Sequence, residues 1–549
     1  MTKWLLILGL FVRSLPGQNY RPGPQVLTYI SDADNSEQPY ALYLPKSLEE
    51  GKKYPLVISL HGAFSNHRLN LRRVFGKGNR PGESDAEASR YFPPLREVDF
   101  IVAAPFARGT MGYRGLAEKD VYDVLADVKR RFPVDEDRVY LTGLSMGGGG
   151  TLWLGLTRPD LWAAIAAVCP AAPPGTEELA PNALNLPVRL FHGDQDPLVP
   201  VAVSRKWYKE LFHLGGPVEY LEYPGVRHNS WDYAYADGQI FDWFGKFRRN
   251  RYPDRVRFVT RWYKYRSAYW VEIDGLTPGE PASLDVRFTG VNELEVQTRG
   301  VAGLTLDLGG HPRFDRARAV TVKIDGSVVK VKPQAAVSLS KQGDSWRAGK
   351  YAPPPGAKRP GAEGPLLEAV SARHIYVYGT AGAKDEAELR RRRAEAEAAA
   401  DWSGPGTPVL ASFRVAADTE VSEDDLRESN LVLFGTWETN RLIARFRDRF
   451  PIELNPGAAD YGLVVVAPAG GRYLVVNSGL PWWTGAERAS RPGLPFLRAP
   501  VHVLAGFGDF VLFKGSLADV VAEGTFDSNW KLKPDQAARL AASGAVTLR

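Results

Sequence analysis

Cysteine is almost absent from this chain of 549 residues, because Cys169 is its only example. A single thiol excludes an internal disulfide and any metal site built from several cysteines. Cys169 lies in the apolar run Ala163–Ala172, so we expect a buried small hydrophobic side chain rather than a reactive thiol. A His-Glu-x-x-His zinc motif, a dinucleotide-binding fingerprint and a phosphate-binding loop are also missing. We therefore expect neither a metal nor a cofactor.

A strong excess of charge is missing too. The chain has 69 Lys and Arg against 63 Asp and Glu, a formal net charge of +6. Two short basic runs stand out, Lys246–Arg251 and Arg390–Arg393. The second continues into alternating Ala and Glu, which is typical of a solvent-exposed helix face. Neither run comes with a nucleic-acid recognition motif, so we expect no nucleic-acid partner.

Apolar runs long enough to cross a membrane are also lacking. The stretch Trp4–Val12 falls well short of the roughly 20 residues that a bilayer requires. It follows a short basic start at Lys3 and is followed by small residues, a pattern that predicts a secretory signal peptide over residues 1–18. We therefore expect a secreted or periplasmic protein without integral membrane association. An uncleaved anchor or an N-terminal strand is the alternative interpretation.

Strand and helix signals alternate over residues 25–251. This alternation predicts the α/β fold class, with a mainly parallel sheet covered by helices on both faces. Apolar strands such as Leu56–Leu60 suit a sheet that is buried on both sides. The expected strands are Tyr40–Leu44, Leu56–Leu60, Phe100–Ala104, Val139–Gly143, Ala163–Val168, Val188–His192 and Val218–Tyr223.

The pattern changes after Pro253. Residues 255–350 carry short strand signals separated by turns and predict a small β-sandwich-like module. Asp325-Gly326 within it has the composition of a tight hairpin turn.

Pro, Gly, Ala and charged residues dominate residues 351–364, which predict a linker. Strand and helix signals, such as His374–Gly379 and Asp385–Asp401, then alternate again. Residues 365–549 therefore predict a second α/β domain. Several domains fit a chain of 549 residues, of which 44% are hydrophobic.

Ser145 lies at the centre of a Gly-x-Ser-x-Gly pattern, Gly143–Gly147. The chain has 54 glycines, so the pattern alone is weak and its context decides. An expected strand leads in and an expected helix leads out, which places the serine on a sharp turn that small neighbours permit. The helix N-terminus favours negative charge at this point. The context predicts a nucleophile, with an ordinary glycine-rich turn as the alternative.

Groups that a nucleophilic serine needs follow other expected strands. The backbone N–H groups of Ala63 and Met146 stand where an oxyanion hole is expected. His61, two residues before Ala63, either contacts substrate or braces the loop.

Asp194 and Asp196 follow the strand that ends at His192, and both are candidates for the acid of a triad. His228 follows the next strand, and the chain order Ser, Asp, His is the one that α/β hydrolases require. Trp231, close to His228 in the chain, is a candidate for substrate contact.

Residues 38–245 resemble the esterase group that holds polyhydroxybutyrate depolymerases, feruloyl and acetylxylan esterases and related predicted peptidases. The resemblance implies an α/β-hydrolase fold in which Ser145, His228 and Asp196, rather than Asp194, are the catalytic residues. Many secreted feruloyl esterases carry disulfides near the site, and this chain departs from them. The motifs that carry the resemblance are Tyr40–Pro45, Leu60–Gly62, Gly143–Gly148, His192–Pro200 and Arg227–Trp231.

Three functions are compatible with these residues. The first is hydrolysis of carboxylic esters, with feruloyl or acetyl esters on polysaccharide as a candidate substrate. The second is a peptidase similar to prolyl oligopeptidase. Met146 and the early start of the α/β region argue against it, because that family often has Tyr after the serine and usually places a β-propeller first. The third is a carbohydrate- or surface-binding protein with a vestigial site, in which aromatic residues of region 255–549 contact the ligand.

All of the proposed catalytic groups lie between Ala63 and His228, and the expected strands complete a sheet before Pro253. From the sequence alone we therefore expect a fragment that ends near Arg251 to fold and to keep the site.

Overall fold

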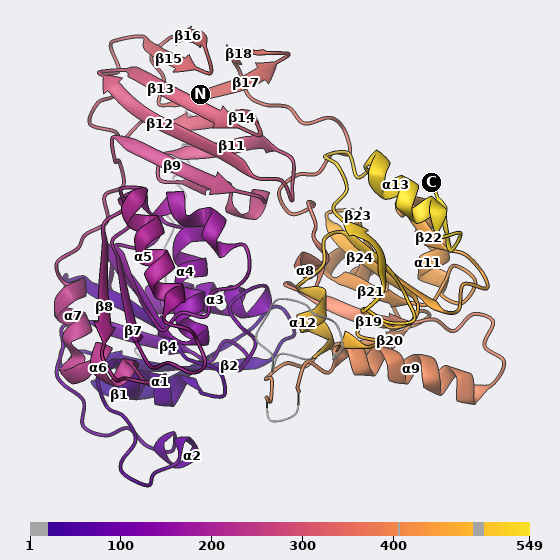
Figure 1. Ribbon diagram of the computed structural model, residues 1–549, viewed down its shortest axis with the longest axis horizontal. Coiled ribbons are helices and arrows are strands. Elements are labelled where there is room, and N and C mark those ends of the chain that lie inside the picture. Colours follow the sequence, from indigo (N-terminus) through magenta and orange to yellow (C-terminus); the bar gives the residue numbers. More distant parts are fainter. Residues whose placement is uncertain (1–19, 405–406, 487–498) are drawn as a thin grey trace, which may run out of the picture.

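The computed structural model describes residues 20–404, 407–486 and 499–549 (Figure 1). The signal peptide expected over residues 1–18 lies outside these described residues. In the part of the chain that is described, no helix has the length and apolar character needed to span a membrane. Figure 1 shows three units: an α/β unit, a β-sandwich above it in the view, and a second α/β unit beside them.

The first unit (residues 23–244) is built on an eight-stranded sheet with the order β1-β2-β4-β3-β5-β6-β7-β8. Strands β3 to β8 run parallel to one another, and β1 and β2 are antiparallel additions at one edge. The predicted α/β class and mainly parallel sheet are confirmed. The edge strand β1 was not expected from the sequence. The strands are β1 (Gly23–Ile30), β2 (Glu37–Leu44), β3 (Tyr54–Leu60), β4 (Ile101–Pro105), β5 (Val134–Leu144), β6 (Ala164–Val168), β7 (Val188–Gly193) and β8 (Val218–Tyr223).

Helices cover both faces of this sheet because successive side chains of a strand point to opposite sides. In β3, Leu56 and Ile58 belong to one hydrophobic core, while Val57 between them belongs to another. The first core includes residues of α3, α4 and α5, and the second includes residues of α1 and α7. The helices are α1 (His67–Val74), α2 (Asp85–Ala88), α3 (Leu116–Arg131), α4 (Met146–Thr157), η1 (Thr176–Asn185), α5 (Ala202–His213), α6 (Trp231–Ala234), η2 (Ala236–Gly238) and α7 (Gln239–Phe244).

The second unit (residues 255–348) consists of two five-stranded sheets, β16-β15-β13-β12-β9 and β10-β11-β14-β17-β18, with a hydrophobic core between them. Asp325 and Gly326 join β15 to β16, and both have positive φ, 43° and 83°, as a two-residue hairpin turn requires. The predicted hairpin is thus confirmed. The elements are β9 (Arg255–Thr260), η3 (Tyr263–Tyr265), β10 (Ser267–Ala268), β11 (Val271–Leu276), β12 (Ala282–Gly290), β13 (Glu293–Arg299), β14 (Val301–Asp307), β15 (Val320–Ile324), β16 (Ser327–Val331), β17 (Ala336–Gln342) and β18 (Ser345–Ala348).

The third unit (residues 366–549) has a seven-stranded sheet with the order β20-β19-β21-β24-β23-β25-β26, and a separate pair β22-β27. The strands are β19 (His374–Tyr378), β20 (Arg414–Ala417), β21 (Asn430–Phe434), β22 (Ile452–Leu454), β23 (Tyr461–Ala469), β24 (Arg472–Gly479), β25 (Phe510–Lys514), β26 (Val520–Gly524) and β27 (Val546–Leu548). The helices are α8 (Leu366–Ala369), α9 (Glu386–Ala400), α10 (Glu423–Glu428), α11 (Arg441–Arg445), η4 (Arg447–Arg449), α12 (Pro500–Leu504) and α13 (Pro534–Ala542).

The segment between the second and third units, residues 351–364, is packed against its neighbours. The Lys358 ammonium is fully buried and forms an ion pair with Asp509 of the third unit. The carboxylate of Glu363 accepts hydrogen bonds from the backbone N–H groups of Tyr263 and Lys264 in the second unit. This segment, whose composition predicts a linker, is therefore bound to both of the units that it connects.

The first and third units share a hydrophobic core. Ala33 and Leu116 of the first unit are buried in the same cluster as Leu366 and Val370 of the third. Met111 of the first unit packs against this cluster and against the core of its own unit. The units thus bury apolar surface against each other, and their independence as domains stays a prediction.

We now expect a fragment of residues 20–251 to be unstable, contrary to the expectation from sequence. Removal of the third unit exposes Ala33, Leu116 and Met111, and newly exposed apolar surface promotes aggregation. Gel filtration and thermal unfolding of the fragment, beside the full chain, measure this. A monodisperse fragment that unfolds at the temperature of the full chain would contradict it.

A pH dependence of stability follows from the burial of Glu363, which is 2% exposed. Burial, with a smaller contribution from the charge of Glu368, raises the pKa of Glu363 from 4.5 to about 8. Because the pKa is raised in the folded state, the folded protein holds this proton more tightly than the unfolded chain does. The contribution of the protonated carboxyl to the free energy of unfolding is therefore complete below pH 4.5 and is lost as the pH rises through 8. Each pKa unit is worth about 1.4 kcal/mol, so the loss is on the order of several kcal/mol.

Glu363→Gln removes this titration. Between pH 6 and pH 9, roughly the range over which the shifted carboxyl ionises, the Tm of this variant is expected to fall less than the Tm of the parent protein. Glu428→Gln, at an exposed position, is the matched control and should follow the parent. Parallel pH profiles of Tm for all three proteins would contradict the assignment.

Candidate active site

The turn between β5 and α4 holds Ser145 in a strained backbone conformation, with φ 55° and ψ −116°. A non-glycine residue at positive φ persists only where its surroundings enforce it. Here the Ser145 N–H donates to the Val168 carbonyl at 2.9 Å, and the Ser145 carbonyl accepts from Gly149 and Ala171. The bonds to Val168 and Ala171 tie the turn to the end of β6, at the carboxyl edge of the sheet, where Ser145 is partly exposed.

Close backbone contacts explain why glycines flank the serine. A Cβ at position 147 would lie 2.2 Å from the carbonyl oxygen of Leu60 at the end of β3. A Cβ at position 143 would lie 2.4 Å from the carbonyl oxygen of Gly147. The Gly-x-Ser-x-Gly pattern is therefore a packing requirement of this turn, as the sequence predicted.

His228 lies in the loop after β8 and connects Ser145 to Asp196. Its Nε2 atom is 3.0 Å from the Ser145 hydroxyl oxygen, and its Nδ1 atom is 2.7 Å from Oδ2 of Asp196. The Asp196 carboxylate is fully buried, whereas the His228 side chain is 18% exposed. The structure thus brings together the three side chains that the sequence selected, in the geometry of a serine, its base and an orienting acid.

Asp196 is held as a carboxylate by several donors. Its Oδ1 atom accepts the backbone N–H groups of Leu198 and Val199 at 2.8 and 3.0 Å. Burial by itself raises the pKa of this carboxyl. The hydrogen bonds from His192, His228 and the backbone outweigh burial and lower the pKa below its ordinary value. Asp196 is therefore ionised throughout the neutral pH range.

His192 is a part of the site that sequence reasoning missed. Its Nε2 atom lies 3.2 Å from Oδ2 of Asp196 and 2.9 Å from the Val199 carbonyl, and its Nδ1 atom pairs with the Ser204 hydroxyl. In the sequence, His192 is only the first residue of the motif His192–Pro200. Its position near the end of β7, four residues before Asp196, is the signal that could have identified it.

Asp194 has a different role from Asp196. Its Oδ1 atom accepts the backbone N–H of Gly225 at 2.7 Å, which joins the loops after β7 and β8. It is a turn-forming residue in this structure, and the geometry favours Asp196 as the partner of His228.

The two proposed oxyanion donors belong to segments next to Ser145. Met146 is the first residue of α4, so its N–H belongs to the donors that a helix leaves without an intrahelical partner. Ala63 lies on the loop after β3. A Cβ on neighbouring Gly62 would be 3.5 Å from the Ser145 Cβ, which shows how close this loop comes to the serine.

His61 and Trp231, the expected substrate contacts, differ in position. His61 is fully buried, and its ring nitrogens lie 2.7 and 2.9 Å from the carbonyl oxygens of Gly62 and Phe106. This placement fits the bracing interpretation instead of substrate contact. Trp231 is partly exposed and packs edge-on against the His228 ring, at a centroid distance of 5.4 Å. Only Trp231 is thus placed to border the site.

Cys169 lies beside the triad. It is buried, as expected, and its thiol donates a weak hydrogen bond to the His228 carbonyl. Its sulfur and the ligand atoms of Asp196 and His228 lie within 4.8 Å of one another. Burial raises the pKa of Cys169 to about 12, so the thiol stays protonated and is a poor metal ligand. The cluster therefore fits acid–base chemistry better than a metal site.

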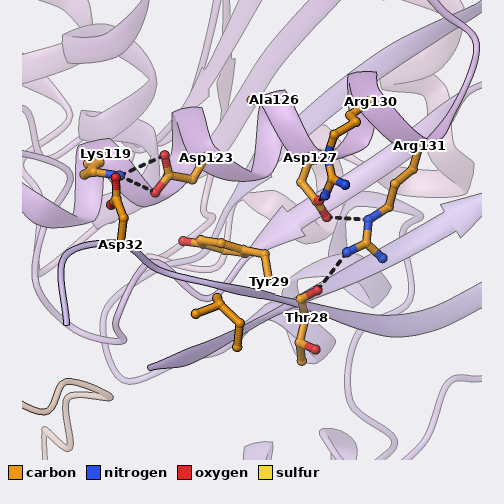
Figure 2. A pocket seen from close by; sticks show the side chains of 10 residues that line it. Thr28, Tyr29, Asp32, Lys119, Asp123, Ala126, Asp127, Arg130 and Arg131 are labelled. Atoms are coloured by element: carbon orange, nitrogen blue, oxygen red, sulfur yellow. Dashed lines mark hydrogen bonds and ion pairs between the residues drawn. The ribbon is translucent and has the colours of Figure 1, made fainter. Parts of the chain in front are cut away.

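A groove with a volume of about 570 Å³ lies elsewhere, between β1 and α3 (Figure 2). Its charged side chains neutralise one another: Lys119 bridges Asp32 and Asp123, at 2.6 and 2.7 Å (Figure 2). This groove contains no nucleophile paired with a base, so the triad geometry, and not the size of the cavity, locates the candidate site.

Parts of this chain are similar to known hydrolases. Residues 119–239 match the family described as phospholipase/carboxylesterase. Cutinase 1 of Thermobifida cellulosilytica is 36% identical over 98 residues, 18% of this chain and 36% of the cutinase. Acyl-protein thioesterase 1 of Gibberella zeae is 30% identical over 99 residues, 17% of this chain and 42% of the thioesterase. The chain thus spans less than half the length of these curated relatives.

Solved structures of two esterases are also similar. A thermostable esterase has a TM-score of 0.33 and 27% identity over 41% of this chain and 63% of its own. A CE1 ferulic acid esterase from Anaeromyces mucronatus has a TM-score of 0.32 and 19% identity, over 42% of this chain and 94% of its own.

Asp196→Asn should slow the phosphonylation of Ser145 by a fluorophosphonate by roughly ten-thousandfold, because the amide favours the wrong tautomer of His228. Asp194→Asn keeps an oxygen acceptor for Gly225 and should react like the parent. Labelling rates followed by mass spectrometry measure both. A normal rate in Asp196→Asn with a slow rate in Asp194→Asn would reverse the assignment.

Proposed function

We propose, from the premise that residues 23–244 form an α/β-hydrolase domain of the serine-esterase type, that this protein hydrolyses carboxylic esters through an acyl-enzyme intermediate. The observation that carries the proposal is the continuous path from the Ser145 hydroxyl through the His228 ring to the buried Asp196 carboxylate, 3.0 and 2.7 Å in its two steps. Ser145 lies on a strained turn and is partly exposed, and the two candidate oxyanion donors, Met146 and Ala63, are on this turn and on the loop after β3.

Acylation begins when Ser145 attacks the ester carbonyl and Nε2 of His228 takes the hydroxyl proton. Asp196 accepts the Nδ1–H of His228, which keeps the ring oriented and stabilises the imidazolium. The N–H groups of Ala63 and Met146 donate to the oxyanion of the tetrahedral intermediate. The imidazolium then gives its proton to the leaving alcohol, and the acyl group stays on Ser145.

Deacylation repeats these steps with water as the nucleophile. His228 takes a proton from the water, which attacks the acyl carbonyl, and the second tetrahedral intermediate uses the same two donors. Collapse of this intermediate breaks the bond to Ser145, returns the proton to the serine and releases the carboxylic acid.

The surroundings of the triad support a substrate with an apolar part. Phe64, which follows Ala63 in the chain, is 57% exposed, and Leu198, which follows the Asp196 turn, is 71% exposed. Both side chains stand on loops that also carry proposed catalytic groups, Ala63 and Asp196, and we propose that they contact the acyl part of the substrate. A feruloyl ester has a large apolar acyl part, and an acetyl ester does not. We therefore favour aromatic or longer acyl esters, linked to polysaccharide or free.

Binding of sugars by a vestigial enzyme has less support. Trp482 and Trp270, two large aromatic residues of region 255–549, are 0% and 2% exposed and belong to hydrophobic cores. Peptides share the tetrahedral intermediate with esters, so a peptide substrate is tested beside the esters.

Ser145→Ala should abolish hydrolysis of 4-nitrophenyl and feruloyl esters, because the covalent route is lost. The expected loss is about a millionfold in kcat. Ser47→Ala, at an exposed serine, is the control and should keep full activity. Assays of both variants with esters, acetylated xylan and peptide anilides test the proposal. It fails if Ser145→Ala retains substantial activity, and peptidase function replaces it if the parent cleaves only the anilides.

A further inference from the structure

The loop after β4, residues 106–111, has an unusual backbone. Ala107, Arg108 and Gly109 are three successive residues with positive φ, 46°, 66° and 104°. Non-glycine residues adopt such angles only where the surrounding structure over-determines them. Contacts on both sides of the loop must therefore hold it in place.

On one side, this loop supports the segment that carries Ala63. The carbonyl oxygen of Phe106 lies 2.9 Å from Nε2 of His61, and the Thr110 hydroxyl accepts the backbone N–H of Phe64 at 2.8 Å. These contacts flank Ala63, the proposed oxyanion donor. Thr110 is only 3% exposed, so water does not compete freely for this bond.

On the other side, the loop is held by a segment of the third unit, residues 407–412, which we name the arm. Val409 and Gly109 form an antiparallel β-bridge, and the Leu410 N–H donates to the Arg108 carbonyl at 3.1 Å. The Leu410 carbonyl accepts from the Arg108 guanidinium at 3.2 Å and from the Gln38 amide at 2.9 Å.

The charge of Arg108 strengthens this junction. Its guanidinium is fully buried and forms ion pairs with Asp34 and Asp120, each at 2.7 Å. Asp34 also accepts the backbone N–H of Ser412 in the arm, at 3.0 Å. A buried ion pair needs complete hydrogen bonding to be favourable, and the arm supplies part of it. The strained loop is thus clamped between the first unit and the arm.

We propose that the arm of the third unit positions the oxyanion hole through the loop 106–111, with Thr110 as the positioning residue for the segment that holds Ala63. The inference rests on the proposed ester hydrolysis. The third unit thus affects the chemistry of a site that lies much earlier in the chain. Val409 of the arm comes roughly 180 residues after His228, the last residue of the triad in the chain.

The proposal predicts a defined kinetic signature. An oxyanion donor acts on charge that develops in the transition state, so its misplacement lowers kcat and leaves KM nearly unchanged. A contact that merely stabilised the fold would lower Tm without this separation of kcat from KM.

Thr110→Val removes the acceptor of the Phe64 N–H and keeps the shape of the side chain, whereas Thr110→Ser keeps the hydroxyl. In the full chain, Thr110→Val should lower kcat on a 4-nitrophenyl ester by about tenfold to a hundredfold, with KM within about twofold of the parent. Thr110→Ser should restore most of the rate. Equal kcat values for the valine variant and the parent would overturn the role of Thr110.

The arm is tested at Leu410, where the side chain is 41% exposed and the backbone makes the contacts. Leu410→Pro removes the N–H that reaches Arg108, and Leu410→Ala keeps it. The proline variant should lower kcat in the same manner and raise hydrogen–deuterium exchange in residues 61–66, and the alanine variant should do neither. Gln38→Met, which removes the second donor to the Leu410 carbonyl, is a further variant in case the proline variant does not fold.

Hydrogen exchange separates failure of this inference from failure of the proposed function, because it does not require turnover. If the parent hydrolyses no ester, the proposed function fails, and the coupling is judged by exchange alone. Faster exchange in residues 61–66 of the arm variants supports the coupling. Folded arm variants with parental exchange in residues 61–66 would overturn it.

Discussion

The close approach of Gly147 to the end of β3 is the constraint on which the rest of the site depends. Only a residue without a side chain fits there, because a Cβ would lie 2.2 Å from the Leu60 carbonyl oxygen and 2.7 Å from that of His61. This contact locks the turn at Ser145 against the start of the loop that carries Ala63. This backbone contact thus holds the turn that carries Ser145 and Met146 next to the loop that carries Ala63.

The remaining groups reach the same place because parallel strands deliver their carboxyl ends to one edge of a sheet. Asp196 and His228 follow β7 and β8, which lie beyond β6 from the serine turn. The Asp196 carboxylate is buried among donors that lower its pKa, so a fixed negative charge faces His228. Burial has the opposite effect on the neighbouring Cys169 thiol, which stays protonated. Of these two groups next to His228, the Asp196 carboxylate is therefore charged and the Cys169 thiol is neutral.

Local sequence patterns predicted much of this arrangement. Ser145, Asp196 and His228 could be selected because each follows an apolar strand, and strands of this kind have a strong short-range signal. The choice of Asp196 over Asp194 needed a family resemblance, since both stand on the same turn. For His61 the sequence left substrate contact and bracing of the loop open, because its partner, the carbonyl of Phe106, lies 45 residues away in the chain.

The contacts between units were beyond the reach of sequence reasoning. Residues 351–364 have the composition of a linker, yet Lys358 and Glu363 are buried by partners that are distant in the chain. The arm at Leu410 meets Gln38 across 372 positions, and its bonds use backbone atoms that any residue would offer. The pattern of residue types along the chain does not indicate such pairing. The fold within each unit was therefore more predictable than the contacts between the units.

In the proposed mechanism, Ser145 carries the acyl group during turnover. The most direct measurement is rapid acid quenching of the full chain during hydrolysis of a 4-nitrophenyl ester, followed by peptide mass spectrometry. We expect a transient mass increase equal to the acyl group on the peptide that contains Ser145, which decays as the ester is consumed. Turnover without any acylated peptide, or with the acyl group on another residue, would contradict it.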